Sequence, residues 1–301
     1  DFNFLMVGTL TGNNPWNDRK NTYFTIKWFC ETFKGNSNVG LVIKASSGRA
    51  TTLDRLITKR ALKQVLDEVR EGEFPRVNLL HGLMNGDEMS ALYREPSIKG
   101  FIGLTRGEGF GLPIGEAMLN KLPVITTAWG GQMDFCNPEN CWLVDYNFKY
   151  TNTHFNLFSS VCAEPVIEDL SRCMNELYYS DKVEISKKVE KARLKIDSYT
   201  WAKVVDINLE FFKKLTTNSK VRNTFVGVVT PWNQKCGIFN YSQNLFNNFD
   251  NQVHIFAPND QLLIHEDEGY VKRCWLYEED QLTDLMHSII HSRLKTIVIQ
   301  F

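Results

Sequence analysis

The chain has 301 residues, of which 43% are hydrophobic and 12% aromatic, so it contains enough apolar material for two packed domains of ordinary size. Its 34 basic and 35 acidic residues give a formal net charge of −1, which supports neither a nucleic-acid partner nor a strongly anionic membrane surface, although local patches stay open. The sequence has no run of about 18 apolar residues and no signal peptide at its start. We therefore expect a soluble chain.

The first half of the chain alternates short apolar runs with helical segments. Continuous apolar runs of this length are typical of parallel strands buried on both faces of a sheet. The alternation predicts an α/β fold with a Rossmann-like, doubly wound parallel sheet. The predicted strands are Phe4–Val7, Leu41–Lys44, Val77–Leu80, Phe101–Leu104, Val124–Thr126 and Trp142–Val144, and the predicted helices lie near 20–34, 52–71, 86–94 and 112–120.

The pattern changes in the second half of the chain. From about residue 166 the periodicity is helical only, and a polar stretch at 216–221 predicts a linker. We expect a first domain over 1–215 and a second, partial α/β domain over 222–301. Its predicted strands are Phe225–Val229, Val253–Phe256, Cys274–Tyr277 and Thr296–Ile299, with helices from Gly237 and near 280–292.

The stretch from Arg106 to Met118, RGEGFGLPIGEAM, is predicted to run from the end of a strand through a glycine loop into a helix. Gly107, Gly109 and Gly111 indicate that the backbone turns sharply here and approaches a ligand closely. Pro113 suits the first turn of a helix. The free amides and positive dipole end of such a helix form a ready anion site, most simply for a phosphate.

Two carboxylates, Glu108 and Glu116, bracket this predicted anion site. A phosphate repels carboxylates, so these side chains are better suited to accept hydrogen bonds from the hydroxyls of ribose or of a sugar ring. Taken singly, Glu116 could instead complement the helix dipole, and Glu108 could be a solvated loop residue. The whole string is more specific than either residue and predicts a nucleotide-sugar site.

At these residues the sequence resembles a family of enzymes. EGFGLPIGEA resembles the E-x7-E motif of the retaining GT-B glycosyltransferases called family 4 or group 1, and KLPVITTAWGGQMDF and CWLVDY resemble the segments that follow it there. The resemblance implies that residues 1–215 form the C-terminal, donor-binding domain of such an enzyme. It implies transfer of a sugar from a nucleoside diphosphate to an acceptor hydroxyl with retention at the anomeric carbon, and with neither a metal ion nor another cofactor.

The resemblance also assigns roles to single residues. Glu108 and Lys20 are the candidate catalytic residues: Glu108 would position the donor sugar, and Lys20 would contact the diphosphate. Glu116 would hold the ribose hydroxyls. The backbone amides of Gly109, Phe110, Gly111 and Leu112 would stabilise the charge that develops on the leaving diphosphate.

Further donor-site candidates follow the other strands. Lys44 would add a second positive charge, whereas the role of Arg19 stays open because the family has its Arg earlier in the loop. Both could instead be ordinary surface cations. Gly82 and Leu83 are expected near the nucleobase. The remaining expectations are a structural role for His81, a weaker sugar-side role for Gly130 and Gly131, and packing roles for Trp129 and Trp201.

The segment TPWNQKCGIFNYSQNL, after the first strand of the second unit, resembles the opening of a GT-B N-terminal domain. Because the donor-type domain comes first here, we expect a tandem protein in which one module ends and the next begins, cut at both ends from a longer chain. The matching GT-B partner domain of the first module would then be missing, and we expect the fragment to be inactive alone. The acceptor would be a carbohydrate, a lipid-linked glycan or a protein glycan.

Two other classes of function stay open. One is another GT-B enzyme, such as a sugar-nucleotide epimerase or a phosphorylase, and the other is a non-catalytic module that binds nucleotide sugars. The seven cysteines are scattered, odd in number and without a C-x-x-C pair, which favours reduced thiols. We therefore expect a cytoplasmic protein, with peripheral association at a membrane left open.

Overall fold

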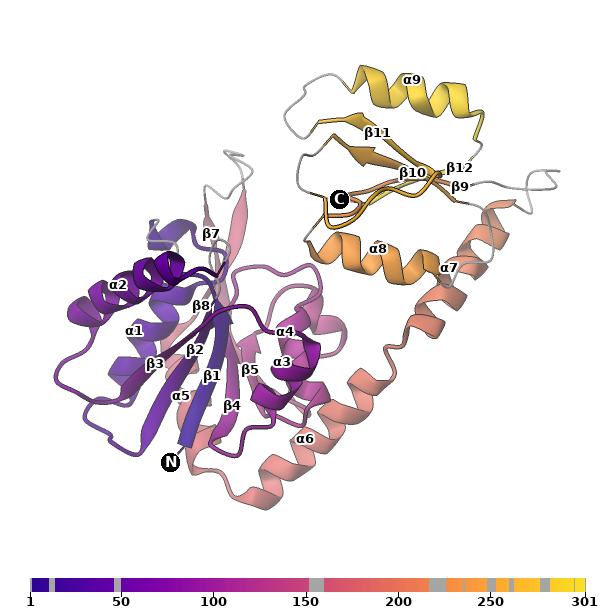
Figure 1. Ribbon diagram of the computed structural model, residues 1–301. Coiled ribbons are helices and arrows are strands. Elements are labelled where there is room, and N and C mark those ends of the chain that lie inside the picture. Colours follow the sequence, from indigo (N-terminus) through magenta and orange to yellow (C-terminus); the bar gives the residue numbers. More distant parts are fainter. Residues whose placement is uncertain are drawn as a thin grey trace. The chain divides into compact units, whose positions relative to one another are not determined.

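Figure 1 presents the computed structural model of the chain. It describes residues 2–10, 14–45, 50–151, 160–216, 226–234, 236–247, 253–259, 263–276, 282–294 and 296–300. The chain divides into two compact units, Asp1–Ser198 and Tyr199–Phe301. Each unit is described by itself below.

The first unit contains a sheet of six parallel strands in the order β3-β2-β1-β4-β5-β6. Its order reverses between β1 and β4, and open sheets of this kind bind ligands at that switch point, beyond the carboxyl ends of the strands. Each strand overlaps one predicted from an apolar run, which confirms the doubly wound α/β sheet. The strands are β1 (Phe2–Gly8), β2 (Val39–Ala45), β3 (Arg76–His81), β4 (Ile98–Gly103), β5 (Val124–Thr127) and β6 (Trp142–Val144).

Helices cover both faces of this sheet (Figure 1). Phe4 and Leu5 are fully buried neighbours in β1, but they join different core clusters because successive side chains point to opposite faces. One cluster packs against α1 (Thr22–Thr32), α2 (Thr52–Val69) and α5 (Ile167–Tyr179), and the other against α3 (Gly86–Tyr93), α4 (Leu112–Leu119) and α6 (Lys182–Asp197).

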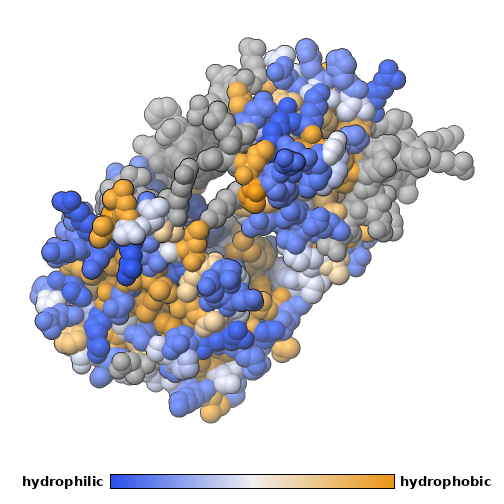
Figure 2. Space-filling view, viewed as in Figure 1, coloured by the Kyte–Doolittle hydropathy of each residue, from blue (hydrophilic) through white to orange (hydrophobic). Residues whose placement is uncertain are grey.

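An antiparallel hairpin of β7 (Tyr146–Tyr150) and β8 (Val161–Pro165) follows the sheet and was not predicted. Its sequence signal is an alternation of aromatic and polar residues in β7, typical of a strand with one exposed face. The face of the molecule seen in Figure 2 mixes apolar and charged side chains, which is usual for folded domains. Among the described residues, no helix is long and apolar enough to cross a lipid bilayer.

The second unit contains four parallel strands in the order β11-β10-β9-β12. The strand expected at Cys274–Tyr277 begins earlier, because Val271 already pairs with Ile255. The elements are α7 (Trp201–Thr216), β9 (Val226–Val229), α8 (Gly237–Asn247), β10 (Val253–Pro258), β11 (Val271–Trp275), α9 (Thr283–Ser292) and β12 (Thr296–Ile299).

The boundary between the compact units differs from the expected one. The sequence placed it at the polar stretch 216–221, whereas the units divide after Ser198, so that α7 groups with the second unit. The ring of Trp201 lies 5.4 Å from that of Tyr241 in α8, and Phe212 packs against the core of the second unit. A polar stretch marks a loop, but the burial of an apolar helix face decides to which core a helix belongs. Residues 217–221 lie outside the described residues.

Candidate functional site

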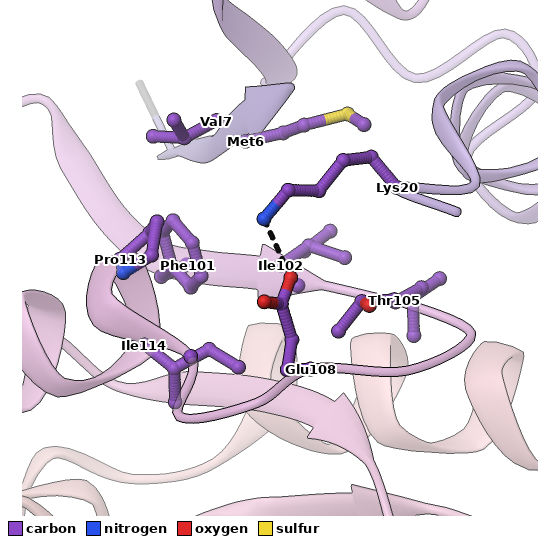
Figure 3. A pocket seen from close by; sticks show the side chains of 12 residues that line it. Met6, Val7, Lys20, Phe101, Ile102, Thr105, Glu108, Pro113 and Ile114 are labelled. Carbon is purple, nitrogen blue, oxygen red and sulfur yellow. Dashed lines mark hydrogen bonds and ion pairs between the residues drawn. The ribbon is translucent and has the colours of Figure 1, made fainter. Parts of the chain in front are cut away.

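The candidate site lies at the switch point of the first sheet, between β1 and β4 (Figure 3). The loop after β1 carries Arg19 and Lys20, and the loop after β4 carries Glu108. The Nζ atom of Lys20 lies 2.5 Å from Oε1 of Glu108, and Nη1 of Arg19 lies 2.9 Å from the same oxygen. The structure therefore brings both candidate catalytic residues, and Arg19, into direct contact.

A pocket surrounds this ion pair (Figure 3). Its cavity volume is about 20 Å³, which is roughly the room that one water molecule needs. The space left beside the ion pair is therefore small in this structure. The other residues that line the pocket are Met6, Val7, Phe101, Ile102, Gly103, Leu104, Thr105, Gly111, Pro113 and Ile114.

The helix that begins beside Lys20 is capped by its own chain. The carboxylate of Asp18 accepts hydrogen bonds from the backbone N–H of Lys20 at 2.9 Å and from that of Thr22 at 2.7 Å. Asn21, at the N-cap of α1, takes a left-handed conformation with φ of 56°. Since a carboxylate already occupies this helix terminus, a phosphate would be repelled from it.

The N-terminus of α4 has no such cap. Gly111 is its N-cap residue, with φ of +86° and no side-chain hydrogen bond. A Cβ atom there would lie 3.2 Å from Ile114 and from Gln132, so both the turn and the space require glycine. Gly107 and Gly109 do not take a left-handed conformation, and an added Cβ would meet no atom within 4 Å at either position. Gly109 still lies in a bend of the chain, and the close approach of a ligand to this loop stays a prediction.

The side chains of Phe110 and Leu112 flank this turn, and they are 38% and 53% exposed. The expectation for these two residues and for Gly109 and Gly111 concerned their backbone amides. α4 starts at Leu112 with Gly111 as its N-cap residue, so these four residues form the approach to an uncapped helix end. Their contact with a diphosphate stays a prediction.

A second glycine pair fixes the Glu108 loop from behind. The backbone N–H of Gly131 donates to the carbonyl of Glu108 at 2.8 Å, and a Cβ atom on Gly131 would lie 1.8 Å from the carbonyl oxygen of Gly109. Gln132 is fully buried and donates from Nε2 to the carbonyl of Trp129 at 2.7 Å. The sequence pointed to Gly130 and Gly131 only as weak sugar-side candidates, and it did not point to Gln132.

Glu116 lies on α4 and contacts Tyr93, which ends α3. The Tyr93 hydroxyl donates to Oε2 of Glu116 at 2.9 Å. Glu116 keeps an exposed face, but partial burial of its carboxylate raises its pKa, against the lowering effect of the hydrogen bond from Tyr93. Burial and the charge of Glu116 raise the pKa of Tyr93. No feature of the sequence pointed to Tyr93 as the partner of Glu116.

Lys44 and Gly82 were separate predictions and lie together in the structure. The Lys44 ammonium donates to the carbonyl oxygen of Gly82, and Lys44 is 5% exposed. Burial lowers the pKa of Lys44, and the charge of Glu88 opposes that effect. Leu83 is 56% exposed beside this pair, as a residue that lines a nucleobase pocket could be. The hydrogen bonds and ion pairs of the described residues do not link Lys44 to the ion pair of Lys20 and Glu108.

Trp129 fits the packing prediction only in part. Its ring lies 4.9 Å from that of Phe148 and 5.7 Å from that of Tyr146, but 41% of Trp129 is exposed. Trp201 is 40% exposed despite its contact with Tyr241. Both rings are therefore half-buried on the surface rather than members of a core.

Arg106, the first residue of the glycine-rich string, was not assigned a role from the sequence. It is 3% exposed and pairs with Glu164 of β8 through Nε at 2.8 Å and Nη2 at 3.1 Å. Its Nη1 atom donates to the carbonyls of Pro15 and Asp18, both at 2.8 Å. The only signal in the sequence was its place between a strand and a glycine loop.

The described residues bring together no cluster of three or more His, Cys, Asp or Glu side chains that could hold a metal ion. The seven cysteines are free, and six of them are buried. The groups that the candidate site offers a ligand are the ion pair of Lys20 and Glu108, the uncapped N-terminus of α4 and backbone carbonyls such as that of Gly82.

Comparisons with known proteins locate this architecture among solved structures. No family model matches the sequence, and no curated protein matches it. An α,α-trehalose 6-phosphate synthase from Burkholderia multivorans is similar over 72% of this chain and 44% of its own, with 10% identity and a TM-score of 0.52. A sucrose-phosphate synthase from Thermosynechococcus elongatus is similar over 72% and 46%, with 18% identity and a TM-score of 0.49.

The C-terminal domain of a glycosyl transferase group 1 family protein from Francisella tularensis is similar over 65% of this chain and 85% of its own, with 17% identity and a TM-score of 0.44. The chain spans less than half the length of the two synthases. At these identities the likeness concerns the fold. The chain has the Rossmann-like α/β fold of the GT-B glycosyltransferases.

Proposed function

We propose that the first unit is the donor-binding domain of a glycosyltransferase that uses a nucleoside-diphosphate sugar. The observation that carries the proposal is the contact between Lys20 and Glu108 at the switch point, beside the uncapped N-terminus of α4. A cation and a helix end together favour an anion, and a carboxylate between them suits the hydroxyls of a sugar.

On donor binding, the diphosphate would replace the carboxylate of Glu108 as the partner of the two cations. The diphosphate takes over the positive charge of Lys20 and Arg19, which Glu108 neutralises in the structure at 2.5 and 2.9 Å. The amides at the start of α4 add a second set of donors on the same side. Glu108, released from both cations, then accepts hydrogen bonds from the donor sugar.

In the proposed reaction the bond between the anomeric carbon and the diphosphate oxygen breaks, and a bond from that carbon to an acceptor hydroxyl oxygen forms. The electron pair of the broken bond stays on the diphosphate, and the hydroxyl proton passes to the departing diphosphate oxygen. Lys20 and the α4 amides stabilise this charge without a metal ion. The retained configuration at the anomeric carbon rests on the resemblance of the E-x7-E motif.

Glu116 and Lys44 would complete the nucleotide end of the site. Glu116 accepts from the ribose hydroxyls while Tyr93 holds its carboxylate from the side, at 2.9 Å. Lys44 presents a buried ammonium next to Gly82 and Leu83, where the nucleobase would lie. The acceptor is a carbohydrate, a lipid-linked glycan or a protein glycan, and the protein acts in the cytoplasm.

The second unit would be the beginning of another GT-B N-terminal domain. It carries the expected strand, glycine-started helix and strand, as β9, α8 and β10. With this assignment the donor domain ends near Ser198 rather than at residue 215. The first module then needs its own partner domain for catalysis, since GT-B chemistry takes place between two matched domains.

Calorimetric titration of the chain with UDP, GDP and ADP, and with their common sugar conjugates, tests the proposal. We expect one nucleotide to bind saturably, and Lys20→Ala and Glu116→Ala to weaken it. Lys34→Ala is the matched control, because Lys34 forms an exposed surface pair with Glu71. A folded chain that binds none of these ligands would contradict the proposal, and binding without sugar transfer in a longer chain would favour a non-catalytic module.

A further inference from the structure

We propose that Arg106 is a positioning residue that holds Lys20 and Arg19 where the diphosphate must bind. Its guanidinium joins two parts of the first unit that are far apart in the sequence: the β1–α1 loop and strand β8. The role of Arg106 in diphosphate binding rests on the proposed function, but the anchoring of the loop follows from the hydrogen bonds alone.

One edge of the guanidinium faces an acid. Nε donates to Oε2 of Glu164 at 2.8 Å and Nη2 donates to Oε1 at 3.1 Å, a two-point contact between two planar groups. The side chains of Arg106 and Glu164 are 2% and 14% exposed. This pairing neutralises Arg106 and fixes the plane of its guanidinium, so the direction of the remaining N–H groups is set.

The other edge of the guanidinium faces the cation loop. Nη1 donates to the carbonyls of Pro15 and Asp18, both at 2.8 Å, and the backbone N–H of Arg106 donates to the carbonyl of Arg19 at 2.9 Å. The loop is thus held at three carbonyls within the five residues that precede Lys20. Buried carbonyls need donors, and an arginine can serve two of them from one nitrogen.

The anchoring reaches Lys20 through Asp18. The carbonyl of Asp18 is bound by Arg106, and its carboxylate binds the backbone N–H of Lys20 at 2.9 Å. The side chain of Lys20 therefore extends toward Glu108 from a backbone position that is fixed. Arg106 is itself buried and paired, so it acts through the loop and does not touch a ligand.

Lysine cannot replace this arrangement. It carries one ammonium and cannot bind both oxygens of Glu164 in one plane while also serving two carbonyls. Arg106→Lys keeps the charge and most of the volume, so it separates the loss of loop geometry from the loss of charge. Glu164→Gln is the second variant, because it keeps the shape but weakens the anchor of the guanidinium. Arg172→Lys, in an exposed pair on α5, is the control.

The test has two readouts. The first is hydrogen exchange of the backbone amides of Lys20 and Thr22 without ligand, which we expect to become about tenfold faster in Arg106→Lys, with a smaller change in Glu164→Gln. Amides of α2 and of the second unit are the internal reference and should not change. Unchanged exchange at Lys20 would overturn the anchoring whether or not the chain binds nucleotides.

The second readout is the affinity for UDP, GDP and ADP, each compared with its nucleoside. We expect Arg106→Lys to lower the affinity for the bound diphosphate by about tenfold and to leave the nucleoside unaffected. In a Lys20→Ala background the same substitution should have a smaller further effect, because only the positioning of Arg19 is then left to lose. Equal losses for nucleoside and diphosphate, or full additivity with Lys20→Ala, would show a general structural role. If exchange is faster in Arg106→Lys but the wild-type chain binds none of the nucleotides, the role in diphosphate binding and the proposed function are overturned and the anchoring of the loop stands.

Discussion

The two sheets share a topology and differ at the point where it reverses. Both place their first strand between the second and the fourth, as β2-β1-β4 in one unit and β10-β9-β12 in the other. At the first switch point Lys20 and Glu108 form an ion pair beside an uncapped helix. At the second, Thr230 and Ser242 share a hydrogen bond of 3.0 Å, and Ser242 donates to Gln300 at 2.9 Å.

The difference shows that strand order determines where a binding site can form, whereas the side chains determine what the site can bind. In the second unit the side chain of Arg273 stabilises the unit's own structure: it pairs with Asp267 at 2.7 Å and donates to the carbonyl of Trp232 at 3.1 Å. In the first unit Arg106 has the corresponding internal role, whereas Lys20 and Arg19, which pair with Glu108, are the cations that we propose meet a ligand. The predictions below test this contrast.

Removal of the buried arginine should have the largest effect. Arg106→Ala leaves Glu164 buried without its partner, and loss of one member of a buried pair costs about 3 to 5 kcal/mol. Arg273→Ala in the second unit should cost less, because its pair with Asp267 is more exposed. Hydrogen exchange in rising urea measures each unit separately. Equal losses of stability in both units would contradict the expected difference between the two arginines.

Removal of the ligand-facing cation should affect binding more than stability. Lys20→Ala removes a charge-assisted contact to the diphosphate, and we expect affinity for the bound nucleotide to fall by about a hundredfold. Stability should change little, because Arg19 remains paired with Glu108 at 2.9 Å. Calorimetry and thermal unfolding separate the two effects. An affinity equal to that of Lys34→Ala would contradict the role of Lys20.

A methyl group behind the Glu108 loop should displace it. Gly131→Ala places a Cβ atom 1.8 Å from the carbonyl oxygen of Gly109, and overpacking against backbone destabilises by about 2 kcal/mol. We expect lower stability of the first unit and weaker nucleotide binding. Gly269→Ala in the second unit meets no atom within 4 Å and is the control. If both variants unfold at the wild-type midpoint, the loops do not pack as closely as described.

The smallest effect concerns Glu116 and depends on pH. Its pKa is raised in the folded state, so the folded protein loses stability as the pH rises through that pKa. Glu116→Gln cannot ionise and should unfold at a slightly higher temperature at neutral pH, with the difference vanishing toward about pH 4. Glu71→Gln, at an exposed surface pair, should show no such trend. A variant less stable than wild type at neutral pH would contradict this sign.

The sequence was sufficient for the strands of the first sheet, because continuous apolar runs such as that of β1 are specific for strands buried on both faces. It also identified Lys20 and Glu108 separately. Their contact depends on β1 lying beside β4, and periodicity does not give strand order. Arg106 was missed because a single arginine beside a glycine loop looks like a surface cation.

The domain boundary shows the same limit. The polar stretch at 216–221 was the strongest break in composition, yet α7 ends there after packing against α8. Composition reports where a chain is exposed, whereas the assignment of a helix to a core depends on long-range contacts. The pairing of Glu116 with Tyr93 joins α4 to α3 across the sequence in the same way.

We propose that the first switch point binds a nucleoside diphosphate and that the second does not. Mapping of backbone amide chemical shifts during titration with UDP, GDP and ADP tests it most directly. We expect saturable shifts at Lys20, Glu108 and Gly111 and none at Thr230 or Ser242. Shifts centred on the second unit, or none at Lys20 and Glu108 with any of the three nucleotides, would contradict it.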